Sequence, residues 1–182
     1  QGVPSLGEIQ SEVVGWTAAL LHGPDTVAGF LTSGDTESIL CAVKAARERG
    51  EAERGITEPE MIVSESAHAA FHKAAHLFGV TLHKTQVRDD WTADVDAMAA
   101  LVSDNTVLLV GSAPQYPQGV VDDIPAIAAL AAASGASCHV DACMGGFVLL
   151  FAEPAGHPVG PAHGHRVGGH AAPGRRRLRR PD

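Results

Sequence analysis

The stretch that decides the fold reads Gly29-Phe30-Leu31-Thr32-Ser33-Gly34-Asp35-Thr36-Glu37-Ser38. An apolar run, residues 27–31, leads into small and hydroxyl-bearing residues, and apolar residues then recur at three- and four-residue steps. This order predicts a strand, a tight turn and the start of a helix. Because a helix start has unpaired N–H groups and the positive end of the helix dipole, such a turn suits a phosphate. Ser33 or Thr36 can cap the helix or donate a hydroxyl to an anion, and an ordinary capped helix is the alternative.

The composition is that of one globular domain with a sizeable core. The chain has 182 residues, of which 45% are hydrophobic, 19% are charged and 4% are aromatic. Its formal net charge of −8 argues against nucleic-acid binding by the main body. No stretch approaches the length of a membrane span. Three cysteines, an odd number, suggest no disulfide framework and favour a reducing, cytoplasmic location.

The last 29 positions differ in composition from the rest. Residues 154–182 hold six of the thirteen basic residues and one acid, among Gly, Pro and His. So few apolar residues cannot offset the entropy of ordering, so we expect a disordered or frameshift-derived tail. A basic tail that binds nucleic acid is the alternative. Residues 1–153 are the expected domain, and the start at Gln1 without a signal pattern suggests a chain that begins partway into a larger protein.

Helical and strand patterns alternate along residues 1–153. We expect helices at 5–22, from the turn at Gly34 to about 49, 67–78, 94–101 and 125–133, and strands at 61–63, 80–84, 106–110 and 136–140. This alternation predicts an α/β fold with a mainly parallel central sheet and helices on both faces. Ligands of such sheets sit at the carboxyl ends of the strands. Residues 33–36, His68, Ser112 and Asp141 all follow apolar strands, so we expect them at one edge.

Asp141 is the sharpest single candidate, within His139-Val140-Asp141-Ala142-Cys143-Met144-Gly145-Gly146. A carboxylate after a strand can hold a cationic ring nitrogen, a metal ion or a water molecule, or it can cap the next turn. His139, Asp141 and Cys143 alternate on one strand face and also suggest a metal ion.

Three histidines, His68, His72 and His76, are spaced by four along one expected helix. Two of them can share a metal ion, but the first and third lie about 12 Å apart at 1.5 Å per residue. No carboxylate occupies the position that an HExxH zinc motif requires. A non-enzymatic, metal-binding α/β module therefore stays open as an alternative function.

Four motifs in this order resemble the sphingosine-1-phosphate lyase family, within the group II pyridoxal-phosphate-dependent decarboxylases. They are Thr32-Ser33-Gly34-Asp35-Thr36-Glu37-Ser38, Ser66-Ala67-His68-Ala69-Ala70-Phe71-His72-Lys73-Ala74-Ala75, Ala113-Pro114-Gln115-Tyr116-Pro117-Gln118-Gly119-Val120-Val121-Asp122 and His139-Val140-Asp141-Ala142-Cys143-Met144-Gly145-Gly146-Phe147. The resemblance covers about residues 3–153. It implies an incomplete large domain of the type I, aspartate aminotransferase-like fold.

The resemblance also implies roles for individual residues around pyridoxal 5'-phosphate. Asp35 and Thr36 would bind the phosphate through backbone N–H groups and the Thr hydroxyl. His68 would stack on the pyridine ring, and Ser112 would line the pocket. Asp141 would pair with the protonated ring nitrogen, which keeps the ring an electron sink.

The family's reaction is a retro-aldol cleavage of a phosphorylated long-chain amino alcohol, which gives a fatty aldehyde and phosphoethanolamine. Such enzymes are usually homodimers with sites at the subunit interface. An amino-acid decarboxylase of the same superfamily is the alternative, although the loop at 113–117 and the segment 141–143 favour the lyase.

Two departures from the family pattern matter. Gly34-Asp35-Thr36 stands where the family has Gly-Gly-Thr, and a carboxylate 4 Å from a phosphate charge costs about 1 kcal/mol in water. Because only the N–H of Asp35 is needed, its side chain can point away. The family's Schiff-base lysine lies downstream of the Asp motif, whereas here no lysine follows Lys84. We therefore expect an inactive fragment with no catalytic residue of its own.

Overall fold

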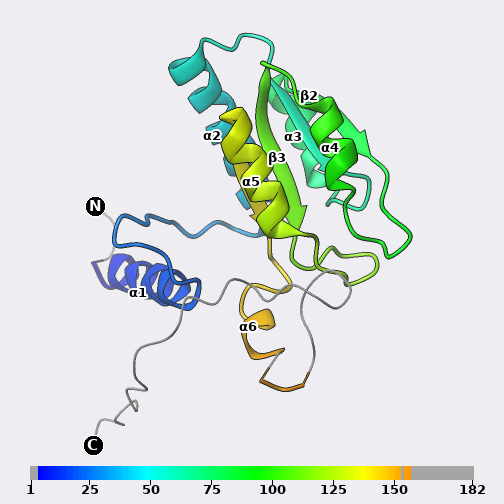
Figure 1. Cartoon of the computed structure of the whole chain (residues 1–182). Helices are drawn as coiled ribbons and strands as arrows, with labels where there is room; N and C mark the ends of the chain where they lie inside the picture. The colour runs from blue at the N-terminus through cyan, green and yellow to red at the C-terminus, as the bar shows by residue number, and fades with distance from the viewer. Residues whose placement is uncertain (1–3, 153, 157–182) are drawn as a thin grey trace, which may run out of the picture.

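The computed structural model describes residues 4–152 and 154–156, so the expected tail lies almost entirely outside the described residues. The helices are α1 (Pro4–Leu20), α2 (Asp35–Arg54), α3 (Ala70–Phe78), α4 (Val95–Leu101), α5 (Ile124–Ser134) and α6 (Leu149–Ala152), and the strands are β1 (Glu60–Ser64), β2 (Thr81–Thr85), β3 (Thr106–Ser112) and β4 (Ser137–Asp141). Figure 1 shows the strands side by side with helices packed against them.

The strands form one parallel sheet in the order β2-β1-β3-β4. The last residue of β1, Ser64, pairs with Thr85 of β2. Likewise Ser112, which ends β3, pairs with Asp141, which ends β4. The carboxyl ends of all the strands therefore meet at one edge, and the predicted parallel α/β fold is confirmed.

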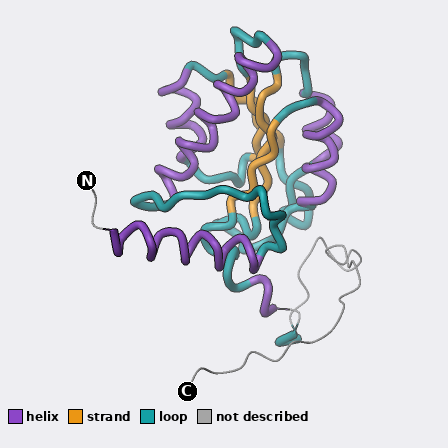
Figure 2. The backbone as a smooth tube through the Cα atoms, turned by 90° about the vertical axis from the view of Figure 1, so that its left-hand side faces the viewer, coloured by secondary structure: helices purple, strands orange, loops and turns teal. Residues whose placement is uncertain are grey.

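Helices cover both faces of the sheet, as the side view in Figure 2 shows, and an apolar cluster lies on each face. On one face, Ile39 of α2 and Phe71 of α3 are among the buried residues that pack with Leu108 of β3. On the other face, Met98 of α4 and Ile127 of α5 belong to a second buried cluster. Leu109, the next residue of β3, joins this second cluster because successive strand side chains point to opposite faces.

Helix ends follow the glycines in the sequence. Gly79 has a positive φ of 63° and ends α3 where the pattern predicts. Helix α2 continues past the expected end at 49 to Arg54, where Gly55 at φ 67° ends it. Helix α3 begins at Ala70, later than expected, so His68 lies in the turn before the helix and not within it.

The predicted strand at residues 27–31 is wrong. This segment is an irregular link between α1 and α2, and Phe30 is 69% exposed. It pairs with no strand of the described residues. An apolar run becomes a strand only when another strand accepts its backbone hydrogen bonds, and here the chain lies away from the sheet.

Helix α1 forms at the predicted place, but its apolar stripe is not covered. Ile9 is 54% and Trp16 62% exposed, and Figure 1 shows α1 below the body of the sheet. Among the described helices, none combines the length and the apolar character that a membrane crossing requires.

Asp122 joins the segments behind the carboxyl edge of the sheet. Its side chain is buried, with one oxygen 2.8 Å from the backbone N–H of Ser112 and the other 2.8 Å from that of Ala93. Burial raises the pKa of this carboxyl, and the two N–H donors partly oppose the rise. Asp122 therefore ties the end of β3 to the segment that leads into α4.

Replacing this carboxylate tests its structural role. We expect Asp122→Ala to lower the free energy of unfolding by about 2–4 kcal/mol, because two buried N–H groups lose a charged acceptor. Asp123→Ala is the matched control, since it removes only the N-cap of α5 and should cost about 1 kcal/mol. Urea unfolding measures both, and equal losses would contradict the assignment.

Candidate functional site

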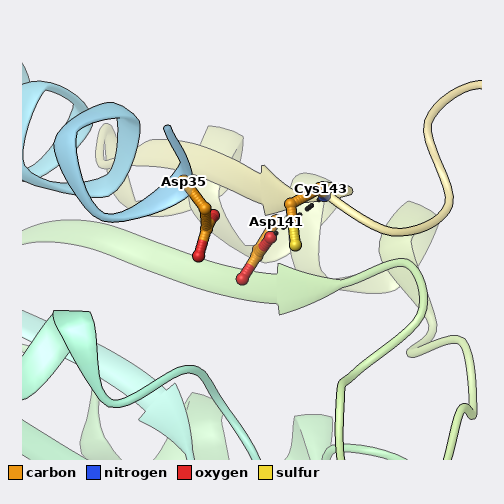
Figure 3. Close-up of side chains that lie close together, drawn as sticks. All are labelled: Asp35, Asp141 and Cys143. Atoms are coloured by element: carbon orange, nitrogen blue, oxygen red, sulfur yellow. Dashed lines mark hydrogen bonds between the residues drawn. The ribbon is translucent and has the colours of Figure 1, made fainter. Parts of the chain in front are cut away.

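The predicted site residues gather at the carboxyl edge of the sheet. Asp35 begins α2 and Asp141 ends β4, and Cys143 follows in the next turn. One ligand-type atom from each of these three side chains lies within 4.8 Å of the other two. Figure 3 shows the two carboxylates and the thiol side by side. Two segments more than a hundred residues apart in the sequence therefore share one site.

His68 joins this cluster from the turn between β1 and α3. Its Nε2 lies 3.4 Å from a carboxylate oxygen of Asp35, and its Nδ1 accepts the backbone N–H of Ala70 at 3.1 Å. About a third of its side chain is exposed. One ring nitrogen thus accepts a hydrogen bond and the other lies beside a carboxylate, while part of the ring stays accessible.

Ser112 and Thr36 complete the predicted set. Ser112 is buried beside Asp141, and the following residue, Ala113, donates its N–H to the Asp141 carbonyl at 2.8 Å. Thr36 follows Asp35 in the first turn of α2 and is exposed. The structure therefore brings all five predicted residues to one edge, with Asp35 close to both His68 and Asp141.

The start of α2 is not capped as predicted. Gly34 is the N-cap, and neither Ser33 nor Thr36 caps the helix. Instead, the carboxylate of Glu37 accepts the hydroxyl and the backbone N–H of Ser33, both at 2.6 Å, and these bonds lower the pKa of Glu37. Glu37 reaches backward because its position in the first turn faces the preceding loop.

This arrangement leaves the first N–H groups of α2 free of internal partners. The first backbone bond of the helix joins the N–H of Ser38 to the carbonyl of Gly34 at 3.1 Å. Among the described residues, no hydrogen bond is made by the N–H groups of residues 35–37. Free N–H groups at the positive end of a long helix can hold an anion.

The turn after Asp141 needs glycine. A Cβ at Gly145 would lie 2.1 Å from the carbonyl oxygen of Ala113, which is closer than any side chain allows. The turn therefore packs directly against the loop that follows β3. Within this turn, the N–H of Cys143 donates to the Asp141 carboxylate at 3.2 Å, which orients the carboxylate.

Cys143 is not poised as a nucleophile. Desolvation by burial, followed by the nearby charges of Asp141 and Asp35, raises the pKa of its thiol to about 11. A thiol with this pKa stays protonated at neutral pH, and the thiolate is the form that attacks.

No histidine belongs to a group of three close metal-type ligands in residues 4–152 and 154–156. His72 and His76 are exposed on α3, and neither belongs to a cluster of three metal-type ligands there. His139 is also outside the cluster that contains Asp141 and Cys143. It packs edge-to-face on Phe71 at 5.9 Å between ring centroids.

Sequence reasoning missed two features of this edge. It found no role for Asp122, although an acid directly after the apolar pair Val120-Val121 is a usable signal for a buried acceptor. It also gave no partner to the Asp35 side chain, which contacts His68 across the fold. No local pattern could have found that contact, because it depends on how α2 and the turn before α3 meet.

Comparisons with known proteins agree with this geometry. The model of the family "Aminotransferase class-V" matches residues 11–146. Sphingosine-1-phosphate lyase 1 of Rattus norvegicus is 46% identical over 166 residues, which are 91% of this chain and 29% of that protein. A probable L-aspartate decarboxylase of Pyrococcus abyssi is 42% identical over 86% of this chain and 39% of that protein.

A solved structure is equally similar. The sphingosine-1-phosphate lyase of Burkholderia pseudomallei superposes with a TM-score of 0.82 at 45% identity, covering 87% of this chain and 38% of that one. The predicted aspartate aminotransferase-like fold is confirmed. The chain spans about 29% of the length of the rat lyase, so it corresponds to part of such a protein.

The half-buried imidazole of His139 gives a prediction for pH. Burial lowers the pKa of His139 below its ordinary 6.5, although Asp141 and Asp35 partly oppose the shift. The folded chain therefore binds this proton less readily than the unfolded chain, so stability is full above pH 6.5 and is lost as the pH falls.

We expect His139→Gln to lose less stability than the parent chain between pH 8 and about 5.5, as measured by urea unfolding at each pH. His76→Gln, on the exposed face of α3, is the control and should leave the pH dependence unchanged. A parent chain and His139→Gln variant with identical pH dependence would show that His139 does not contribute.

Proposed function

The chain belongs to the aminotransferase class-V family, and from that premise we propose that its carboxyl edge binds pyridoxal 5'-phosphate. The observation that carries the proposal is the meeting of three groups at one place. A helix start with free N–H groups, an accessible imidazole and a buried carboxylate all lie at this edge. These groups match a phosphate, an aromatic face and a protonated ring nitrogen, so the donor set fits the cofactor.

Asp141 would hold the ring nitrogen. Its side chain is only 8% exposed and lies within 4.8 Å of a second carboxylate, that of Asp35. Two carboxylates this close repel each other, and a buried negative charge is unfavourable without a cationic partner. A pyridinium N–H would supply that positive charge.

The first turn of α2 would hold the phosphate. The free N–H groups of residues 35–37 and the exposed hydroxyl of Thr36 are its donors. Asp35 contributes its N–H, while its carboxylate is turned toward His68 and Asp141. This agrees with the expectation that the Asp35 side chain can point elsewhere.

His68 would present its ring to the cofactor face, and buried Ser112 would close the pocket beside Asp141. When bound, pyridoxal phosphate supplies an electron sink for a substrate that carries an amino group. The residues of this chain position that group and keep its ring nitrogen protonated through Asp141.

We infer that the reaction is the retro-aldol cleavage of a phosphorylated long-chain amino alcohol. Similarity at 45–46% identity to two proteins named sphingosine-1-phosphate lyase supports this substrate class. Amino-acid decarboxylation is the second candidate, supported by the 42% identical archaeal protein. The two reactions can be separated in a polypeptide that also carries the Schiff-base lysine. Release of an aldehyde would indicate the retro-aldol cleavage, and release of carbon dioxide would indicate the decarboxylation.

This chain by itself is proposed to be inactive. Its lysines are Lys44 on α2, Lys73 on α3 and Lys84 on β2, and all three are exposed. None follows Asp141 in the sequence. The cofactor would therefore be held by non-covalent contacts alone.

Cofactor binding is the direct test. We expect the chain to bind pyridoxal phosphate in equilibrium dialysis, and Asp141→Ala to weaken binding about tenfold or more, because the ring nitrogen loses its charged acceptor. Asp123→Ala, outside the site, should bind like the parent chain. Borohydride treatment should leave no cofactor attached to the protein.

Two results would contradict the proposal. Equal binding by the parent chain and Asp141→Ala would remove the ring-nitrogen site. Cofactor that stays on the protein after borohydride reduction and unfolding would disprove the non-covalent, inactive state.

We also propose that the apolar surface around α1 is covered by a second copy of the chain, as in a homodimer. Helix α1 and the following link carry seven large apolar side chains that are exposed: Leu6, Ile9, Trp16, Leu21, Val27, Phe30 and Leu31. An exposed apolar surface of this kind marks an interaction surface.

We further propose a cytoplasmic location for the chain. The absence of disulfides among Cys41, Cys138 and Cys143 supports this location.

Association can be measured directly. In sedimentation velocity we expect the parent chain to form dimers at micromolar concentration, and Ile9→Ser combined with Trp16→Ser to shift it to monomers. Leu77→Ser is the control, because Leu77 is 55% exposed on α3, away from this surface. A parent chain that is monomeric at all concentrations would refute the proposal.

A further inference from the structure

The side chain of Asp35 is the feature of this edge that the proposed function leaves unused. Only 26% of the side chain is exposed, and its Oδ2 lies 3.4 Å from Nε2 of His68. Asp35 opens α2, whereas His68 belongs to the turn before α3. The contact thus joins two separate elements at the place where the cofactor would bind.

The other ring nitrogen of His68 fixes where its proton lies. Nδ1 accepts the backbone N–H of Ala70 at 3.1 Å, so Nδ1 carries no proton while this bond is made. In the neutral ring the proton is therefore on Nε2, which is the nitrogen that faces Asp35. A carboxylate facing an N–H favours this tautomer and restrains rotation of the ring.

We propose that Asp35 is a positioning residue that holds His68 in one tautomer and one ring orientation at the carboxyl edge. The proposal rests on the proposed cofactor site, since the oriented ring is the one that would face the pyridine. The carboxylate of Asp35 acts through the imidazole, while its backbone N–H remains one of the proposed phosphate donors.

A direct effect of Asp35 on the ligand is the competing explanation. Its carboxylate also lies within 4.8 Å of an Asp141 oxygen, so it adds negative charge near the ring nitrogen and near the helix start. A purely electrostatic effect depends on the charge alone. Positioning depends on an acceptor atom facing Nε2, which an asparagine retains and an alanine lacks.

The experiment combines two substitutions at Asp35 with a double-mutant cycle between Asp35 and His68. The variants are Asp35→Ala, Asp35→Asn, His68→Phe and Asp35→Ala with His68→Phe, and pyridoxal phosphate is the probe in equilibrium dialysis. Asp89→Ala is the matched control, because Asp89 is exposed on the loop after β2. Circular dichroism confirms that each variant is folded. If the Ala variant is not folded, the nearly isosteric Asn variant is measured in its place.

We expect Asp35→Ala to weaken binding about three- to fivefold, as for a partly exposed charged contact. Asp35→Asn should weaken it less than about twofold, and Asp35→Ala should have little effect when His68 is already Phe. Tighter binding in both Asp35 variants, or an equal effect of Asp35→Ala with and without His68, would overturn the proposal in favour of direct charge repulsion.

Nitrogen-15 spectra of the cofactor-free chain give a second readout that needs no ligand. In the parent chain the neutral His68 ring should show the Nε2–H tautomer. In Asp35→Ala it should show a mixture of the two tautomers, with faster exchange of the Nε2 proton with water. Unchanged His68 signals would refute the positioning role. Changed signals without any cofactor binding would keep that role and refute the proposed function instead.

Discussion

Parallel pairing of β1, β3 and β4 is the constraint on which the rest of the structure depends. Because neighbouring strands run in the same direction, each delivers its last residue to the same edge. Ser112 lies beside Asp141 for this reason alone. The buried Asp122 then holds the end of β3 against the loop before α4, so the edge is rigid where the chemistry is proposed.

Charge is the second determinant of this edge. Asp35, Asp141 and the nearby Glu37 place three carboxylates around the start of α2, and the imidazole of His68 contacts one of them. Under the proposed function, a protonated ring nitrogen would lie at Asp141 and a phosphate at the free N–H groups of α2. Glu37 is drawn off to Ser33 and Asp35 to His68, which leaves the helix N–H groups open.

The setting of Asp35 could not be judged from the sequence alone. A carboxylate at this position looks unfavourable beside a phosphate when only the sequence is considered. In the folded chain its Oδ2 lies 3.4 Å from Nε2 of His68, whose Nδ1 accepts the backbone N–H of Ala70. The carboxylate therefore has an imidazole partner that is distant in the sequence.

Local sequence patterns determined most of the elements, because helix periodicity, β-prone runs and glycine ends act over a few residues. They placed β1, β3, β4 and α5 within a few residues, and the family resemblance implied roles for Asp35, Thr36, His68, Ser112 and Asp141. They failed at residues 27–31, where apolar character predicted a strand that has no neighbour to pair with. Only the tertiary structure decided that pairing, the burial of Asp122 and the contact between Asp35 and His68. Each of these requires two segments far apart in the chain to meet, and no short-range preference encodes such a meeting.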